Sequence, residues 1–149
     1  MVKAFLLKPQ PISLANQLGD LKKKCGNMIE NARVSNGLLT CIMWFQPTIH
    51  SMRYKIKITY KLKRNPHAWL LYPQAEKYND SYPHHKYGFD KKGNLELCFF
   101  DPRGYEWSPQ DFIADSVVPW ISTWLFAYEY WIIIGKWIYP ESNRSKDNR

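Results

Sequence analysis

A strict alternation of apolar and polar side chains over residues 53–63 constrains the fold of this chain more than any other feature. A β-strand places successive side chains on opposite faces, so a period of two indicates a strand with one buried face. The polar positions are basic apart from one threonine, which predicts that the other face is basic and exposed to water. The apolar positions are Tyr54, Ile56, Ile58, Tyr60 and Leu62, and the polar positions are Arg53, Lys55, Lys57, Thr59, Lys61 and Lys63.

Two further strands are expected on either side of this one. Residues 38–45 are rich in β-forming side chains, and Pro47 follows them. Residues 67–72 form another apolar run, which lies between Pro66 and Pro73. Proline ends a strand because it has no N–H group to donate to the ladder. The sequence therefore predicts three consecutive strands.

A helix is expected before these strands. Ser13 stands where an N-cap residue is needed, and leucines follow it at spacings of four and three residues. Apolar side chains at residues 28–32 extend the same face past Gly26, so we expect the helix to continue, broken or kinked at the glycine, to the turn at residues 35–37. The first leucines of the face are Leu14, Leu18 and Leu21.

Helical signals return in the last third of the chain. Ser108 and Pro109 suit the N-cap and first turn of a helix, and Gly135 is expected to end the helical region. Residues 117–134 are apolar and long enough to span a membrane, but Glu129 lies within them, so we interpret them as a buried helix and expect no membrane contact. The inward face of this helix is expected to carry Trp120, Trp124, Tyr128 and Trp131.

The order of these elements predicts the fold class. Residues 74–92 are polar and are expected to form a long loop, with Cys98 beyond it on a short extended piece. A helix, a run of strands, a loop and further helices favour an α+β fold with an antiparallel sheet. We expect residues 1–141 to form a single domain and the polar residues 142–149 to be a flexible tail.

Charge and cysteine content limit the class of function. The net charge of +8 favours acidic partners, although solubility alone explains it equally well. Three widely spaced cysteines, Cys25, Cys41 and Cys98, argue against a disulfide framework. The set His67, His84, His85 and Cys98 matches no zinc spacing, so no metal or cofactor is expected. Residues 1–9 hold too short an apolar run for a signal peptide, which favours a reducing cytoplasmic setting with free thiols.

The segment around Cys98 carries the most specific signal. Two adjacent histidines and Tyr87 precede a glycine turn at Gly93, a Leu-x-Leu-Cys step ends at Cys98, and Trp107 opens a Trp-Ser-Pro sequence. This order resembles the active-site segment of ubiquitin-conjugating enzymes, where a His-Pro-Asn-aromatic sequence precedes a Gly-x-(Ile/Leu)-Cys step and then Trp-(Ser/Thr)-Pro. This chain has no Asn in the lead-in, where His85 or Lys86 stands instead.

A second group of segments resembles a narrower family. Residues 106–109, 114–120, 124–131 and 135–137 are similar to bacterial stand-alone conjugating-enzyme-like proteins, which accompany cyclic-oligonucleotide synthases in CBASS antiphage operons. The resemblance implies a ubiquitin-conjugating-enzyme-like fold: an N-terminal helix, a meander of strands, an active-site loop and a C-terminal helix that crosses the sheet. It also implies that Cys98 takes the C-terminus of a partner, a cGAS-like nucleotidyltransferase, as a thioester and passes it to the amine of a protein or small molecule.

Candidate roles follow for the residues of this segment. Cys98 is the expected nucleophile, and a histidine, preferably His85 over His84, is expected to orient the loop or relay a proton. Asp101 is a candidate for steering the incoming amine, although forming a turn before a proline is its simpler role. The residues expected to support the active-site loop are Tyr87 and Trp107, and those expected to contact a partner protein are Lys22, Lys23 and Lys24.

Two other functions remain open. The missing Asn favours an inactive conjugating-like module that only binds partners. A weaker interpretation is nucleic-acid binding through the basic strand, since aromatic rings beside basic residues suit single strands. The rings of that strand are expected to point inward, away from its lysines, which argues against stacking.

Overall fold

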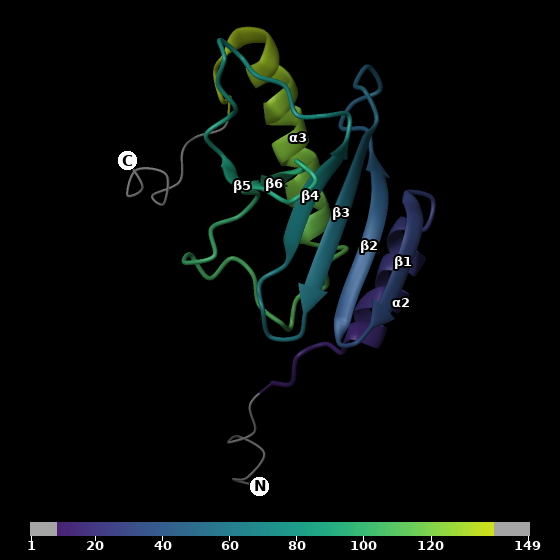
Figure 1. The fold of residues 1–149 in the computed structure, drawn as a ribbon. Helices are drawn as coiled ribbons and strands as arrows, with labels where there is room; N and C mark the ends of the chain where they lie inside the picture. Colours follow the sequence, from purple (N-terminus) through teal and green to yellow (C-terminus); the bar gives the residue numbers. More distant parts are fainter. Residues whose placement is uncertain (1–8, 139–149) are drawn as a thin grey trace, which may run out of the picture.

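The predicted strands form the centre of a six-stranded antiparallel sheet. The computed structural model describes residues 9–138, so the predicted tail at 142–149 lies outside the described residues. The strand order is β1-β2-β3-β4-β6-β5 (Figure 1). The elements are α2 (Leu14–Cys25), β1 (Ile29–Ser35), β2 (Leu38–Phe45), β3 (Tyr54–Lys61), β4 (His67–Tyr72), β5 (Lys86–Phe89), β6 (Leu95–Leu97) and α3 (Val117–Ile134).

The prediction of an α+β fold with an antiparallel sheet is confirmed. The bounds of β2 and β4 are those expected, and β3 occupies the centre of the alternating segment. Its buried and less buried residues alternate over almost its whole length, as a period of two requires. Ser13 caps α2 as predicted, because its hydroxyl accepts a hydrogen bond from the Asn16 N–H at 3.1 Å.

The predicted extension of the first helix is wrong. The helix ends at Cys25, and residues 29–35 form β1, which pairs with β2 in a hairpin. Asn36 and Gly37 make the two-residue turn, with φ angles of 52° and 73°. An Asn-Gly pair between apolar runs is a strong hairpin signal because both turn positions need a positive φ. This signal outweighs the helical spacing of residues 28–32.

Two loop and helix boundaries also differ from the expectation. Residues 74–92 are not all loop, because β5 lies within them and pairs with β6 at the edge of the sheet. Residues 107–116 contain no helix, and α3 begins only at Val117. The Ser108 hydroxyl contacts the Gln110 side chain instead of capping a helix. Hydrogen bonds between Gln17 of α2 and the backbone of Asp111 and Ile113 hold this segment in turns. These long-range contacts cannot be read from the local sequence.

Both helices pack on the same face of the sheet, where the core lies. Figure 1 shows α3 crossing behind the central strands, with α2 on the β1 side of the same layer. The predicted inward face of α3 is confirmed for its three buried rings, whereas Trp120 is half-buried. Gly135 ends the helix as expected, with φ of 74° and its N–H bonded to the Trp131 carbonyl at 2.8 Å. The buried rings are Trp124, Tyr128 and Trp131.

Helix α3 is the one helix in the described part of the chain that is long and apolar enough to cross a membrane. In this fold, 44% of its residues are buried inside the protein, where they face the sheet. A core helix meets the same criteria of length and hydropathy. The contacts of α3 are therefore those of a core helix, and the cytoplasmic setting stays a prediction.

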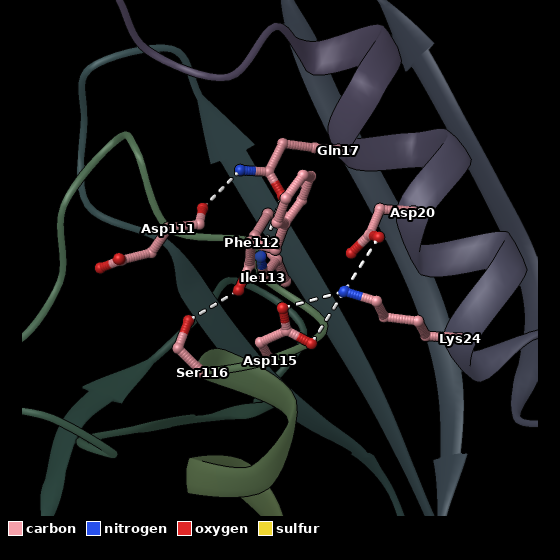
Figure 2. A network of polar contacts seen from close by, with 8 residues as sticks. All are labelled: Gln17, Asp20, Lys24, Asp111, Phe112, Ile113, Asp115 and Ser116. Carbon is pink, nitrogen blue, oxygen red and sulfur yellow. Dashed lines mark hydrogen bonds and ion pairs between the residues drawn. The ribbon is translucent and has the colours of Figure 1, made fainter. Parts of the chain in front are cut away.

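A polar clasp joins α2 to the segment that leads into α3 (Figure 2). The Gln17 side chain is fully buried; its amide donates to the Asp111 carbonyl at 2.8 Å and accepts from the Ile113 N–H at 2.9 Å. Lys24 lies about two turns further along α2. Its ammonium binds Asp20 at 3.1 Å and Asp115 at 2.9 Å. These contacts fix where α3 starts.

The outer face of the sheet is not covered by either helix. The even-numbered residues of β3 are buried against the helices, so its lysines face outward. Trp44 of β2 and Trp69 of β4 lie on this outer face beside them, with Lys57 Nζ 5.0 Å from the centre of the Trp69 ring. The prediction that the rings of the basic strand point away from its lysines is confirmed for β3, and the rings beside those lysines come from the neighbouring strands.

Alkaline pH is expected to destabilise the fold through three buried acids. Burial raises the pKa of the Cys41 thiol from 9.0 to about 12 and that of Tyr128 from 10.0 to about 12, and it also raises the pKa of Tyr54. Each group has a higher pKa in the folded state than in the unfolded state, so its contribution to stability is complete below its unfolded pKa. That contribution is lost as the pH rises from the unfolded pKa to the folded pKa. We expect the free energy of unfolding to fall above about pH 9, by up to about 1.4 kcal/mol per pH unit for each group.

Urea denaturation at a series of alkaline pH values measures this loss. Tyr54→Phe removes one of the three groups, so its pH slope should be smaller than that of the wild type by about one group. A free energy of unfolding that stays constant up to about pH 11 would contradict the burial of these groups.

Candidate active site around Cys98

The three cysteines differ sharply in burial. Cys25 is 6% exposed and Cys41 is fully buried, and burial raises the pKa of both thiols. Cys98 is only partly buried. A thiol must be accessible and must reach the thiolate state to act as a nucleophile. Burial therefore excludes Cys25 and Cys41 from this role and leaves Cys98 as the candidate.

Backbone contacts hold Cys98 at the end of a short strand. The preceding residue, Leu97, is fully buried and pairs with Lys86 of β5. The Cys98 N–H then donates to the His85 carbonyl at 3.2 Å. On the other side, the Tyr87 hydroxyl donates to the Phe100 carbonyl at 3.4 Å, a long hydrogen bond. The histidine segment and the cysteine segment thus lie side by side, as the sequence order suggested.

Helix α3 holds both the histidine segment and the cysteine segment in place. The indole N–H of Trp124 donates to the His85 carbonyl at 2.8 Å, so this oxygen accepts from α3 and from Cys98 together. Phe100 is 5% exposed and stacks on Trp120, with ring centres 5.7 Å apart. A buried anchor therefore follows Cys98 by two residues, as Leu97 directly precedes it, and the cysteine is held between two fixed points.

The two candidate histidines have different environments. His84 is exposed. His85 is half-buried, and its ring stacks on Trp137 with centres 4.8 Å apart and planes 30° from parallel. Trp137 also packs against Trp124, at 5.4 Å between ring centres. A ring held in this way keeps one orientation beside the cysteine segment, which favours His85 over His84 for a positioning role.

Asp101 forms the turn that follows the cysteine segment. Its carboxylate accepts the Arg103 N–H at 2.9 Å and lies 3.7 Å from the Arg103 guanidinium, and its own N–H donates to Glu106 at 2.8 Å. These are the contacts of the simpler, turn-forming role. A second role of Asp101 in steering an amine stays a prediction.

The remaining candidate residues make their contacts elsewhere in the fold. Trp107 is 8% exposed and meets the Tyr60 ring edge-on at 5.6 Å, so β3 positions it in the core. Hydrogen bonds to the Asp115 carboxylate, and secondly to Asp20, raise the pKa of Lys24. The Lys24 ammonium therefore takes part in the clasp. Lys22 and Lys23 are exposed on α2. Within residues 9–138, no group of three His, Cys, Asp or Glu side chains is placed to hold a metal ion.

Sequence reasoning missed the residues that tie the site to α3. Trp124 and Trp120 were expected only as core rings, yet one donates to the His85 carbonyl and the other supports Phe100. The sequence indicates Trp137 only as part of a segment that resembles the conjugating-enzyme-like family. The signal was present as the regular spacing of the rings on α3, but spacing alone does not tell which ring reaches which loop.

A helix, an antiparallel sheet with a meander of four strands, a cysteine directly after the short strand β6 and a crossing helix together define an E2-like protein, with the ubiquitin-conjugating-enzyme-like fold. A family model described as Type II CBASS E2 protein matches residues 17–144, which is most of the chain. The protein therefore belongs to the Type II CBASS E2 family. A search of curated proteins found no match to this chain.

Thiol labelling in the native state should distinguish the three cysteines. Iodoacetamide is expected to modify Cys98 and to leave Cys25 and Cys41 unmodified, because burial both shields their sulfur atoms and raises their pKa. Mass spectrometry of the intact protein should give one adduct before denaturation and three after it. Labelling of Cys41 at a rate similar to that of Cys98 would contradict the burial of the strand thiol.

Proposed function

We propose that this protein is a cysteine-dependent acyl carrier and transferase. Cys98 takes the C-terminus of a partner protein as a thioester and transfers it to an amine, which primes antiphage defence. The accessibility of Cys98 carries this proposal, because the other two thiols are buried. Membership of the Type II CBASS E2 family supports it. The partner is a protein of the CBASS operon, and we propose the cGAS-like cyclic-oligonucleotide synthase.

The chemistry divides one acyl transfer into two steps. The partner's C-terminal carbonyl arrives activated, as an acyl adenylate or as another thioester. The Cys98 thiolate forms the new C–S bond, and AMP or the other thiolate leaves. A neutral amine then attacks the thioester carbonyl; the C–N bond forms, the C–S bond breaks, and the amine's proton passes to the thiolate or to water. Attack by thiolate makes each step easier than direct amide formation.

The neighbouring residues have positioning roles in this proposal. His85 supplies the carbonyl that holds the Cys98 N–H, and its ring is held by Trp137. Tyr87 ties the two segments together through the Phe100 carbonyl. We also propose His85, rather than the exposed His84, as the residue that relays a proton from the amine. Lys22 and Lys23, exposed on α2, are proposed contacts for a partner protein.

A trapping experiment tests the proposal. Cys98→Ser is co-expressed with the other proteins of the operon, so that the activating step is supplied in the cell. Serine converts the labile thioester into a more durable ester. We expect an adduct that survives a reducing gel and that mass spectrometry locates between residue 98 and the C-terminus of the synthase. Cys98→Ala should give no adduct.

The alternative function is a conjugating-like module that only binds its partners. The absence of an Asn from the lead-in favours it, because that residue is credited with oxyanion support in ubiquitin-conjugating enzymes. This alternative predicts that Cys98→Ser folds and co-purifies with the synthase but forms no adduct. That result would contradict the acyl-carrier proposal.

A further inference from the structure

Cations line the outer face of the sheet. Lys55, Lys57 and Lys61 of β3 project from the face opposite to the core, since the residues between them are buried against the helices. In the described part of the chain, three carboxylates lie on or beside this face: Glu30 and Glu96 are each paired with a side chain of the same face, at 3.0 and 2.7 Å, and Asp90 lies within electrostatic range of Lys57. The cations of the face, which also include Arg53 beside Trp44 and Arg64 at the turn after β3, outnumber these carboxylates, and a polyanion is attracted to such a surface.

Two exposed aromatic rings stand among these cations, and a tryptophan supports each of them. The His67 side chain is 50% exposed and stacks on Trp69, with ring centres 5.8 Å apart and planes 26° from parallel. Tyr72 is 56% exposed and meets Trp44 edge-on at 6.1 Å. A shift in the β3–β4 register between Lys55 and its neighbour turns Tyr72 to the outer face. Both rings have surface available for stacking.

A polar depression adjoins the first of these rings. Its volume is about 340 Å³, and it lies on the outer face at the turn between β3 and β4. Lysine, arginine, amide and hydroxyl groups surround it, which are the groups that bind phosphate and sugar oxygens. The residues that line it are Leu38, Thr59, Lys61, Arg64, Asn65 and His67.

From this combination we propose that the outer face of the sheet binds single-stranded nucleic acid. The bases stack on His67 and Tyr72, the lysines of β3 neutralise the phosphates between them, and the depression takes one phosphate and its sugar. The two rings stand five residues apart on β4, which is about 17 Å. Sequence-tolerant binding of this kind needs both a cationic track and exposed rings. An acidic protein would use the cations but would have no use for two exposed stacking surfaces, so the rings favour nucleic acid.

Fluorescence anisotropy tests this proposal on the full chain. The probes are fluorescein-labelled single strands of roughly 12 nucleotides of mixed sequence, as DNA and as RNA, and a polyglutamate peptide of equal charge. We expect the single strands to bind, and to bind more weakly at about 200 mM salt than at about 50 mM. Tyr72→Ala is expected to weaken binding about fivefold or more, whereas Tyr72→Phe keeps the ring and should retain most of the affinity.

A pair of charge variants provides the matched control. Lys61→Ser/Arg64→Ser removes two cations from the depression, and Lys22→Ser/Lys23→Ser removes two from α2, in the opposite layer. We expect the first variant to weaken binding about tenfold and the second to change it little; circular dichroism checks that all variants fold. Equal losses from both, or no binding at low salt, would overturn the proposal. Polyglutamate that binds as tightly as the single strands, with no effect of Tyr72→Ala, would overturn it in favour of an acidic protein partner.

Discussion

Replacing Cys98 with alanine is expected to reduce acyl transfer at least about a thousandfold while the free energy of unfolding stays close to that of the wild type. Removal of a nucleophile costs several orders of magnitude in rate, because no other group can form the covalent intermediate. Cys98 is only partly buried, so truncation to alanine leaves less empty space in the core than the same change at a fully buried cysteine. Transfer is measured as the fraction of synthase joined to an acceptor amine after co-expression with the operon.

The other two cysteines give a matched control with the opposite outcome. Cys25→Ala and Cys41→Ala remove the sulfur atoms of two residues that are 6% and 0% exposed. We expect each to lower the free energy of unfolding by about 1 kcal/mol, through the space left in the core, and to leave transfer intact. If Cys98→Ala transfers as well as the wild type, the proposed nucleophile is wrong, whatever the two controls do.

Replacing Gln17 with methionine is expected to lower the free energy of unfolding by about 3 kcal/mol. Methionine keeps the length and most of the volume of the side chain but removes both amide hydrogen bonds. The Ile113 N–H then loses its partner in a buried place, and the Asp111 carbonyl loses its partner in a partly buried one. Each buried group left without a hydrogen bond costs about 1–3 kcal/mol. Urea denaturation with an unchanged m-value measures the loss.

Asn16→Leu is the control for this change. Asn16 neighbours Gln17 on α2 but is exposed, and the contacts of the clasp are made by Gln17 and Lys24 instead. An exposed substitution of this kind is expected to change stability by less than about 0.5 kcal/mol. A Gln17→Met variant as stable as Asn16→Leu would mean that the clasp does not fix the segment before α3. Because α3 also holds His85 and Phe100, the Gln17 variant should lose acyl transfer at temperatures where it partly unfolds.

The part of the site on the cysteine side was predictable because its signals are local. The order of histidines, glycine, cysteine and tryptophan lies within one short stretch, and the structure brings His85 and Cys98 into hydrogen-bond contact. Trp124 lies 26 positions after Cys98 in the chain, and Trp137 lies farther still. Their contacts with the histidine segment depend on how α3 crosses the sheet, which spacing along the chain does not encode.

The outer face illustrates the same limit. The alternation in β3 correctly predicted where its lysines and rings point. It did not reveal that neighbouring strands add Trp44 and Trp69 beside those lysines, because strand order and register decide which residues meet across the sheet. A single shift in the β3–β4 register is enough to turn Tyr72 outward.

The sequence by itself determined the features that depend on neighbouring residues. These are the period-two strand, the ring-bearing face of α3, the cap at Ser13, the stop at Gly135 and the motif around Cys98. Only the tertiary structure decided that residues 29–35 are a strand, that residues 107–116 are not a helix, and that two of the three thiols are buried. The physical reason is that propensity and period act within a few residues, whereas burial, register and the satisfaction of buried polar groups are set by segments far apart in the chain.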